Sequence, residues 1–256
     1  MNNRPFDFAG ATAIVIGGAS GLGRAMAEGL ASHGARVAIA ARQLDKARAA
    51  ADQIAQQTGG AVDACSADLT SEASVVALGA FIGETFGGQL NIAVNSGGTN
   101  IRNPIDDISL TEFETVQRTN ITGAFLFART VHPFLRKAGW GRLIHITSIF
   151  SSRSFPGRTS YASSKGALLQ LTRTLALEWA TEGITVNAIS PGPIATEMMK
   201  PVMEDPRRAE QFLRRIPVNR FGEPREIATA ALFLASPASS FVTGADVVVD
   251  GGWMSA

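Results

Sequence analysis

The chain has 256 residues, of which 45% are hydrophobic, and its 23 Lys and Arg nearly balance its 22 Asp and Glu. This composition is typical of a well-packed globular protein, and the balanced charge excludes the broad basic surface that a nucleic-acid partner requires. One cysteine, Cys65, excludes an internal disulfide framework, and with no secretory signal and no apolar run long enough to span a membrane we expect a cytoplasmic protein without a membrane partner.

Short apolar stretches alternate with longer helix-like stretches along the chain. The apolar stretches predict strands at residues 11–17, 36–41, 61–65, 90–95, 141–147, 184–190 and 247–250. The helix-like stretches predict helices at residues 22–33, 44–57, 71–86, 111–137, 159–181 and 224–235. Because nearly all-apolar strands alternate with helices, we expect an α/β fold with a doubly wound parallel sheet and helices on both faces.

One segment interrupts this alternation. Residues 191–221 hold five prolines among many charged residues. A stretch of this length without regular structure is usually a functional loop, so we expect a surface insertion or a lid over the substrate. The rest of the chain has no linker and no repeat, and we therefore expect a single catalytic domain over residues 1–256.

The first predicted strand runs into a glycine-rich turn. Residues 17–23 read Gly-Gly-Ala-Ser-Gly-Leu-Gly, which puts Gly17, Gly21 and Gly23 at the start of the first predicted helix. A helix N-terminus offers free N–H groups and a positive dipole end to a pyrophosphate, and glycine lets the backbone turn tightly against it. Ordinary turns also contain glycines, but the position between the first strand and a helix favours a dinucleotide site.

The end of the second predicted strand distinguishes the two nicotinamide cofactors. An acidic residue there would bond the ribose hydroxyls and repel a 2′-phosphate. This chain has Arg42 instead, and a guanidinium can hold a phosphate through two hydrogen bonds. We therefore predict NADP(H) ahead of NAD(H), with a solvated arginine at a helix start as the alternative.

Asp68 and Leu69 follow the third predicted strand. A carboxylate at this place can accept a hydrogen bond from the adenine amino group, while the leucine packs on the ring. Asp68 can equally be a cap for the helix that begins near Ser71, and the sequence leaves both roles open.

The reacting centre is predicted around the only tyrosine of the chain. Tyr161 and Lys165 are four residues apart on a predicted helix, so both lie on one face. A tyrosine hydroxyl has a pKa of about 10, and a nearby ammonium lowers it toward the range in which it exchanges protons. Ser148 ends the fifth predicted strand, at the edge where ligands bind, and can donate to a substrate oxygen. Asn120 is either a satisfied buried amide or the holder of a water that links Lys165 to solvent.

Taken together, these motifs resemble the classical short-chain dehydrogenase/reductase family from Gly10 to Gly252. Asn187, the Pro-Gly step at 191–192 and the closing Val-Asp-Gly-Gly at 249–252 also match. The resemblance implies a single-domain Rossmann fold with a seven-stranded sheet and, usually, a homotetramer. The enzyme is then expected to interconvert a ketone and a secondary alcohol by hydride transfer.

The same resemblance assigns roles to the site residues. Tyr161 is the general acid–base, Lys165 lowers its pKa and binds the nicotinamide ribose, and Ser148 orients the substrate oxygen. Asn120 supports a proton relay. The residues expected to bind the cofactor are Gly17, Ser20, Gly21, Leu22, Gly23, Arg42, Asp68, Leu69, Asn95, Tyr161, Lys165, Ile194 and Thr196.

The chain departs from the family pattern at two places. Ile16 stands where the family usually has threonine, and residues 95–98 read Asn-Ser-Gly-Gly rather than Asn-Asn-Ala-Gly. We expect Ile16 to cost local rigidity, and Ser96 and Gly97 to loosen the wall near the adenosine ribose. Neither change touches the predicted proton path.

The substrate is left open between two classes. The pattern resembles both 3-oxoacyl reductases and gluconate 5-dehydrogenase-like enzymes. In the loop before Tyr161, Arg153 or Arg158 can meet an anionic group, whereas Phe150 and Phe155 can line an apolar pocket. The arginines favour a sugar acid. The three histidines show no metal-ligand spacing, so we expect no metal. A catalytically silent NADP(H)-binding sensor is the alternative, which the complete set of four catalytic residues disfavours.

Overall fold

The computed structural model describes residues 6–256. Within them, seven parallel strands form one sheet in the order β3-β2-β1-β4-β5-β6-β7. The strands are β1 (Thr12–Ile16), β2 (Arg36–Ala41), β3 (Val62–Ser66), β4 (Ile92–Asn95), β5 (Gly141–Ile146), β6 (Ile184–Pro191) and β7 (Asp246–Val249). The predicted doubly wound parallel sheet of a Rossmann fold is confirmed. Its strand order reverses between β1 and β4, where folds of this kind bind ligands.

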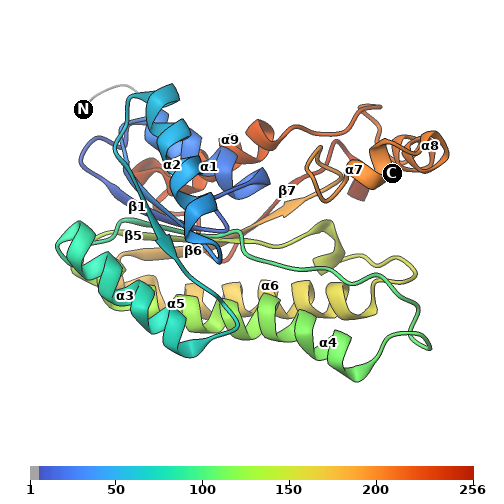
Figure 1. The fold of residues 1–256 in the computed structure, drawn as a ribbon, viewed down its shortest axis with the longest axis horizontal. Coiled ribbons are helices and arrows are strands. Elements are labelled where there is room, and N and C mark those ends of the chain that lie inside the picture. Colours follow the sequence, from blue (N-terminus) through green and yellow to red (C-terminus); the bar gives the residue numbers. More distant parts are fainter. Residues whose placement is uncertain (1–5) are drawn as a thin grey trace.

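Helices cover both faces of the sheet (Figure 1). One face carries α1 (Gly21–Ser32), α2 (Leu44–Thr58) and α9 (Pro224–Ala235), and the other carries α3 (Glu72–Phe86), α5 (Gly123–Lys137) and α6 (Thr159–Trp179). A hydrophobic core lies on each face: the first core packs against α1, α2 and α9, and the second core packs against α3, α5 and α6. Alternate residues of β1 point to opposite sides of the sheet, so Val15 belongs to the first core and Ile14 to the second. Both faces are therefore buried, as the all-apolar strands predict.

Local signals in the sequence fix several element boundaries. The Ser71 hydroxyl accepts a hydrogen bond from the Ser74 amide at 3.3 Å and caps α3. Gly59 ends α2 with a φ of 70°, a left-handed conformation that favours glycine. The helix predicted at residues 224–235 starts and ends at those residues. Asp68 is not the N-cap of α3, because Ser71 takes that place.

The long helix predicted at residues 111–137 contains an irregular turn. It consists of α4 (Leu110–Gln117), a π-helical turn over Arg118–Thr122, and α5. A π turn adds one residue to the helix and is common at functional sites. Here it carries the buried Asn120, whose side chain bonds to groups outside the helix.

Two short helices occupy the proline-rich segment. They are α7 (Lys200–Met203) and α8 (Pro206–Leu213), which lie near the C-terminus of the chain (Figure 1). The Phe212 ring centroid is 5.5 Å from that of Trp253, and the Val218 amide donates to the Gly251 carbonyl at 3.3 Å. The segment is thus folded onto the C-terminal residues, and its movement as a lid stays a prediction.

No helix within residues 6–256 combines the length and apolarity that crossing a membrane requires. Cys65 is buried and unpaired, and burial raises the pKa of its thiol to about 12. The thiol therefore stays protonated and unreactive at neutral pH. A cytoplasmic location stays a prediction.

Candidate active site

A cavity of about 730 Å³ lies along the carboxyl edge of the sheet. Its lining comes from the segments that follow β1, β2, β3, β4, β5 and β6, together with the first residues of α6 and with Phe212 and Trp253. In a doubly wound sheet this edge is the expected ligand site. The cavity therefore brings together motifs that are far apart in the sequence.

The glycine-rich turn begins the cavity beside α1. Gly17 has a φ of 78°, and a Cβ there would lie 2.9 Å from the Ser96 backbone. A Cβ on Gly23 would lie 2.2 Å from the Gly17 carbonyl oxygen. Ser20 is the N-cap of α1, is exposed and makes no side-chain cap bond. The turn thus leaves a free hydroxyl and the first amides of α1 for a pyrophosphate.

Gly97 was expected to loosen the wall of the cavity, but the Leu69 side chain packs against this glycine. A Cβ on Gly97 would lie 2.4 Å from Leu69 Cδ1, and a Cβ on Gly123 would lie 2.7 Å from Leu69 Cβ. The leucine side chain fills the space that an alanine at position 97 would take. Gly97 therefore permits tight packing here. Ile16 is buried in the second core.

Arg42 and Asp68 both line the cavity, next to the ends of β2 and β3. The Arg42 side chain is exposed and makes no hydrogen bond or ion pair with residues 6–256. One Asp68 carboxylate oxygen accepts from the Thr70 amide at 2.9 Å and from its hydroxyl at 2.8 Å. These bonds, and after them the charge of Arg42, hold the Asp68 pKa below its usual value. The carboxylate is ionised and keeps its second oxygen for a donor such as an amino group.

Tyr161, Ser148 and Lys165 line the same cavity. Burial raises the pKa of the Tyr161 hydroxyl, and the Ser148 side chain, within hydrogen-bonding reach of it, acts in the opposite direction. Lys165 is only 4% exposed, and its Nζ is 5.7 Å from the centroid of the Tyr161 ring. It donates to the Ile146 carbonyl at 2.7 Å. Burial lowers the Lys165 pKa to about 8.

Backbone and hydroxyl contacts fix Ser148 just beyond β5. The Phe150 amide donates to its Oγ at 3.2 Å, and the Ser190 hydroxyl donates to its carbonyl at 3.0 Å. Ser190 Oγ is in turn 2.9 Å from the Thr147 hydroxyl. β5 and β6 therefore position the serine together.

Asn120 does not line the cavity but holds two of its walls. Its amide exchanges hydrogen bonds with the backbone of Thr99, at 2.8 and 2.9 Å, and donates to Ser164 Oγ at 2.9 Å. A Cβ on Gly98 would lie 3.3 Å from the Asn120 oxygen and 3.5 Å from Lys165 Nζ. The interpretation as a satisfied buried amide thus describes its side chain, and its part in a proton relay stays a prediction.

Asn95 and Gly23, both predicted to contact the cofactor, also lie outside the lining. The Asn95 amide accepts from the Gly97 amide at 3.2 Å and faces His145 Nδ1 at 3.3 Å. Burial lowers the His145 pKa to about 3, so this imidazole is neutral. Asn95 therefore shapes the loop that borders the cavity. The other predicted cofactor residues, Ile194 and Thr196 among them, do line it.

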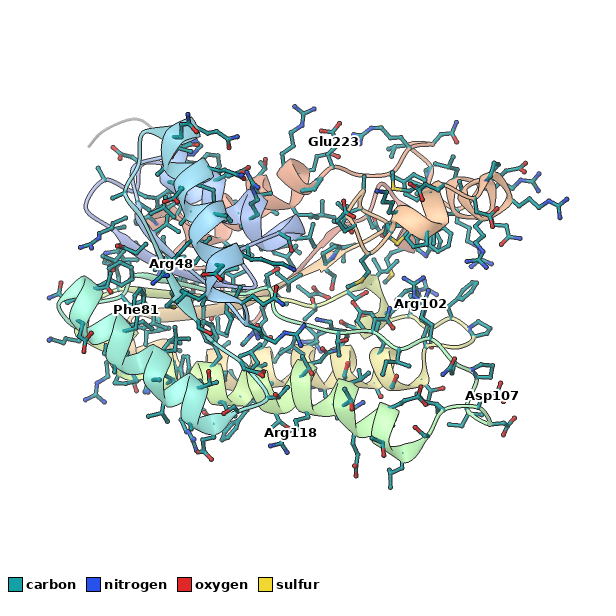
Figure 2. The ribbon with its side chains drawn as sticks, viewed as in Figure 1. Arg48, Phe81, Arg102, Asp107, Arg118 and Glu223 are labelled. Atoms are coloured by element: carbon teal, nitrogen blue, oxygen red, sulfur yellow. The ribbon has the colours of Figure 1, made fainter. Side chains whose placement is uncertain are left out.

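Two arginines add positive charge beside Tyr161. Arg158, at the start of α6, is 7% exposed, and its charge together with that of Arg102 lowers the Tyr161 pKa against the effect of burial. Arg102 lies on the segment after β4 (Figure 2), and both side chains line the cavity. Sequence reasoning named Arg158 as one of two options and missed Arg102, because no pattern distinguishes it from other loop arginines. Arg153 is exposed, bonds to the Met254 carbonyl at 3.3 Å and does not line the cavity.

No group of three or more His, Cys, Asp or Glu within residues 6–256 is arranged to hold a metal ion. The arrangement offers a hydroxyl acid–base, a second hydroxyl and several cations instead. Such a site can bind a dinucleotide and exchange a proton with a substrate oxygen.

Comparison with known proteins gives matches over nearly the whole chain. A family profile described as enoyl-(acyl carrier protein) reductase matches residues 17–254. Glucose 1-dehydrogenase of Gluconobacter oxydans is 38% identical over 246 residues, covering 96% of this chain and 92% of that protein. The 7α-hydroxysteroid dehydrogenase of Escherichia coli is 37% identical over 243 residues, covering 95% and 94%. The structure of a gluconate 5-dehydrogenase from Burkholderia cenocepacia, in complex with NADP and tartrate, superposes with a TM-score of 0.94 at 33% identity and covers 98% of each chain.

Proposed function

The chain belongs to the classical short-chain dehydrogenase/reductase family, whose members are NAD(P)-dependent oxidoreductases of CH–OH groups, and from this premise we propose that it uses NADP(H) to interconvert a ketone and a secondary alcohol. The observation that carries the proposal is the meeting of Tyr161, Ser148 and Lys165 in one cavity with the glycine-rich turn. A hydroxyl acid–base next to a dinucleotide cradle suits hydride and proton transfer to one carbonyl group.

The turn after β1 fits a dinucleotide. Gly17 and Gly23 leave no room for a Cβ, and Ser20 has a free hydroxyl at the start of α1. These residues would hold the pyrophosphate, while Ile194 and Thr196 would hold the nicotinamide. When bound, the cofactor supplies or accepts the hydride.

Residues of the chain transfer the proton that the substrate oxygen gains or loses. In the reducing direction, the Tyr161 hydroxyl gives its proton to the carbonyl oxygen of the substrate as that carbonyl becomes an alcohol. Ser148 holds the same oxygen by a hydrogen bond. The Lys165 ammonium, 5.7 Å from the ring, stabilises the phenolate that remains. Asn120 would support a proton relay toward Lys165, because its side chain fixes Thr99 and Ser164 next to that residue.

Arg42 supports NADP(H) over NAD(H). Its side chain is exposed at the cavity and forms no ion pair with the described residues, although its charge acts on the Asp68 carboxylate. The solved gluconate 5-dehydrogenase has NADP bound. A 2′-phosphate on the adenosine ribose would give Arg42 a charge-assisted partner.

Two substrate classes remain within this proposal. The first class is a sugar acid or polyol, and the arginines next to Tyr161 support the sugar acid. The second is a 3-oxoacyl compound, which the acyl-carrier description of the matched profile supports. The segment that contains α7 and α8 borders the cavity through Met198, Met199 and Phe212. It would act as a lid over either substrate.

A homotetramer is also proposed. Large apolar side chains are exposed on helices away from the cavity, among them Leu177 at 82% and Phe125 at 47%, and Phe241 before β7 is fully exposed. Such side chains are typical of subunit interfaces. A light-scattering mass four times the 26.9 kDa of one chain is the expected result.

A substrate screen tests the proposed function. Purified protein is assayed in both directions with NADP(H) and NAD(H) against sugar acids, polyols, 3-oxoacyl thioesters and hydroxysteroids. We expect turnover with at least one substrate, faster with the phosphorylated cofactor. Tight NADPH binding without turnover of any substrate would contradict the proposal and favour the NADP(H)-binding sensor.

A further inference from the structure

Arg158 is the most unusual charged residue of the described chain. It is 93% buried, since only 7% of its surface is exposed. Its Nε and Nη1 have no hydrogen-bond partner within residues 6–256. Buried guanidinium groups normally bond all their donors or pair with a carboxylate, so two unsatisfied nitrogens at this depth suggest a role beyond folding.

Burial, the helix dipole and Arg102 make the charge of Arg158 less favourable, whereas Tyr161 and the Phe150 ring act in the opposite direction. Arg158 is the N-cap residue of the 21-residue helix α6, where the helix dipole disfavours a cation. Burial first, and then the charge of Arg102, lower its pKa to about 10. It stacks 5.5 Å above the Phe150 ring. An anion bound to Arg158 would relieve the repulsion and satisfy its donors.

The position of Arg158 connects it to the reaction. It lines the main cavity beside Tyr161, and it also lines an adjoining cavity of about 310 Å³ enclosed by Phe150, Phe155, Phe212 and Trp253. Arg215 also lines that second cavity, and its guanidinium lies 5.0 Å from the Phe155 ring centroid and 5.8 Å from that of Trp253. An anion that reaches Arg158 therefore lies next to the group that donates the proton.

We propose that Arg158, assisted by Arg102, binds a carboxylate of the substrate, so that the enzyme acts on hydroxy acids and oxo acids whose carboxylate is a few bonds from the reacting carbon. A planar guanidinium suits a carboxylate because it can donate two parallel hydrogen bonds. A long acyl thioester would instead place apolar chain against these two cations. This inference deepens the proposed function and rests on it, because the bound carboxylate belongs to a substrate only if the protein is an oxidoreductase.

The first test compares acids with neutral esters. Acetoacetate, levulinate and 2-oxogluconate, each paired with its methyl ester, are reduced with NADPH by the wild type, Arg158→Met and Arg158→Lys. In at least one pair, the wild type is expected to prefer the acid by roughly tenfold or more in kcat/KM, the size of effect that a charge-assisted bond gives. Arg158→Met is expected to lower this acid-to-ester ratio at least tenfold, with Arg158→Lys between the two.

Arg153→Met is the matched control, because it removes an exposed arginine of the same loop that does not line the cavity. It is expected to keep the wild-type ratio. An unchanged ratio in Arg158→Met, or a wild type that prefers esters, would overturn the proposal.

A second measurement does not depend on turnover. Thermal melts are recorded with saturating NADP⁺, because the oxidised cofactor has no hydride to transfer to the keto group of an oxo acid. Acetoacetate, levulinate or 2-oxogluconate is expected to raise the Tm of the wild type and of Arg153→Met but not of Arg158→Met. The ligand-free Arg158→Met protein is expected to melt above the wild type, since a buried unpaired charge has been removed; this also verifies that it folds.

The two proposals fail in different ways. If oxo acids raise the Tm of the wild type but not of Arg158→Met, and no substrate is turned over, the anion site is supported and the oxidoreductase function is contradicted. If neutral ketones are turned over and no carboxylate changes the Tm, the oxidoreductase function is supported and the anion site is contradicted. Inorganic phosphate at equal ionic strength is the third arm, and a larger Tm rise with phosphate than with any carboxylate would overturn the carboxylate assignment.

Discussion

Tyr161 is surrounded by three cations of different kinds. Lys165 is buried and bonded to the Ile146 carbonyl, Arg158 is buried without a partner for two of its nitrogens, and Arg102 is exposed at the cavity. The spacing of Tyr161 and Lys165 is a local property of one helix, so the sequence predicts it. The burial of Arg158 depends on Phe150 and on segments distant in the chain, and no local pattern carries that information.

The pH dependence of reduction follows from Lys165. Because burial lowers its pKa to about 8, the ammonium that supports Tyr161 is present below pH 8 and is lost as the pH rises through that value. The Tyr161 hydroxyl has a raised pKa and stays protonated over the same range. We expect kcat/KM for ketone reduction to be level below pH 7.5 and to fall about tenfold per unit well above pH 8.

The measurement is a pH profile of initial rates with saturating NADPH and limiting ketone. A constant rate up to pH 10 would contradict the assignment of Lys165. NADPH binding measured at each pH is the control that separates loss of catalysis from loss of cofactor.

Cofactor choice rests on one exposed side chain. Arg42→Ala is expected to raise the KM for NADPH by roughly 10- to 100-fold, the loss of one charge-assisted phosphate contact, and to leave the KM for NADH unchanged. Arg48→Ala is the matched control, since it removes an exposed arginine of α2 outside the cavity (Figure 2). Equal effects of the two substitutions on NADPH would show that Arg42 is only a surface charge.

Secondary structure was predicted well where local chemistry decides it. Ser71 caps α3 and Gly59 ends α2 because hydroxyl and glycine groups satisfy helix ends wherever they occur. The π turn at Arg118–Thr122 was not predicted. It adds a single residue to a long helix, which hardly changes the apolar repeat, and Asn120 is fixed there by Thr99 and Ser164 from other segments.

The turn before α1 is expected to tolerate no side chain at Gly23. A methyl group would lie 2.2 Å from the Gly17 carbonyl oxygen, and backbone on both sides cannot give way locally. Gly23→Ala is therefore expected to lower the Tm by several degrees, the result of about 1–3 kcal/mol of overpacking. It is also expected to weaken NADPH binding more than tenfold, because the turn that holds the pyrophosphate is distorted.

Gly83→Ala, in the last turn of α3, is the control. Its nearest neighbour would be a Phe134 ring atom at 3.9 Å, an ordinary contact. This variant is expected to bind NADPH like the wild type and to melt at the same or a higher temperature, since alanine favours a helix by about 1 kcal/mol over glycine. Normal NADPH binding by Gly23→Ala would contradict the role of the turn.

The whole molecule brings Tyr161, Ser148 and Lys165 to one edge of one sheet. Two cores, one on each face, hold the strands in register, and the carboxyl ends of β1 to β6 then meet around the cavity. Strand alternation and family motifs predicted this arrangement. They did not predict that Asn95 and Asn120 lie outside the cavity lining, because the place of a side chain depends on its tertiary partners, here His145 and Ser164.

The central claim is that Tyr161 transfers the proton in a reaction driven by NADP(H). It is tested most directly by comparing wild type and Tyr161→Phe for NADPH binding and for turnover of the best substrate from the screen. We predict that the variant binds NADPH as the wild type does and that its kcat falls by roughly 10²- to 10⁴-fold, the usual contribution of a general acid–base. Turnover by Tyr161→Phe within about threefold of the wild type would contradict the account.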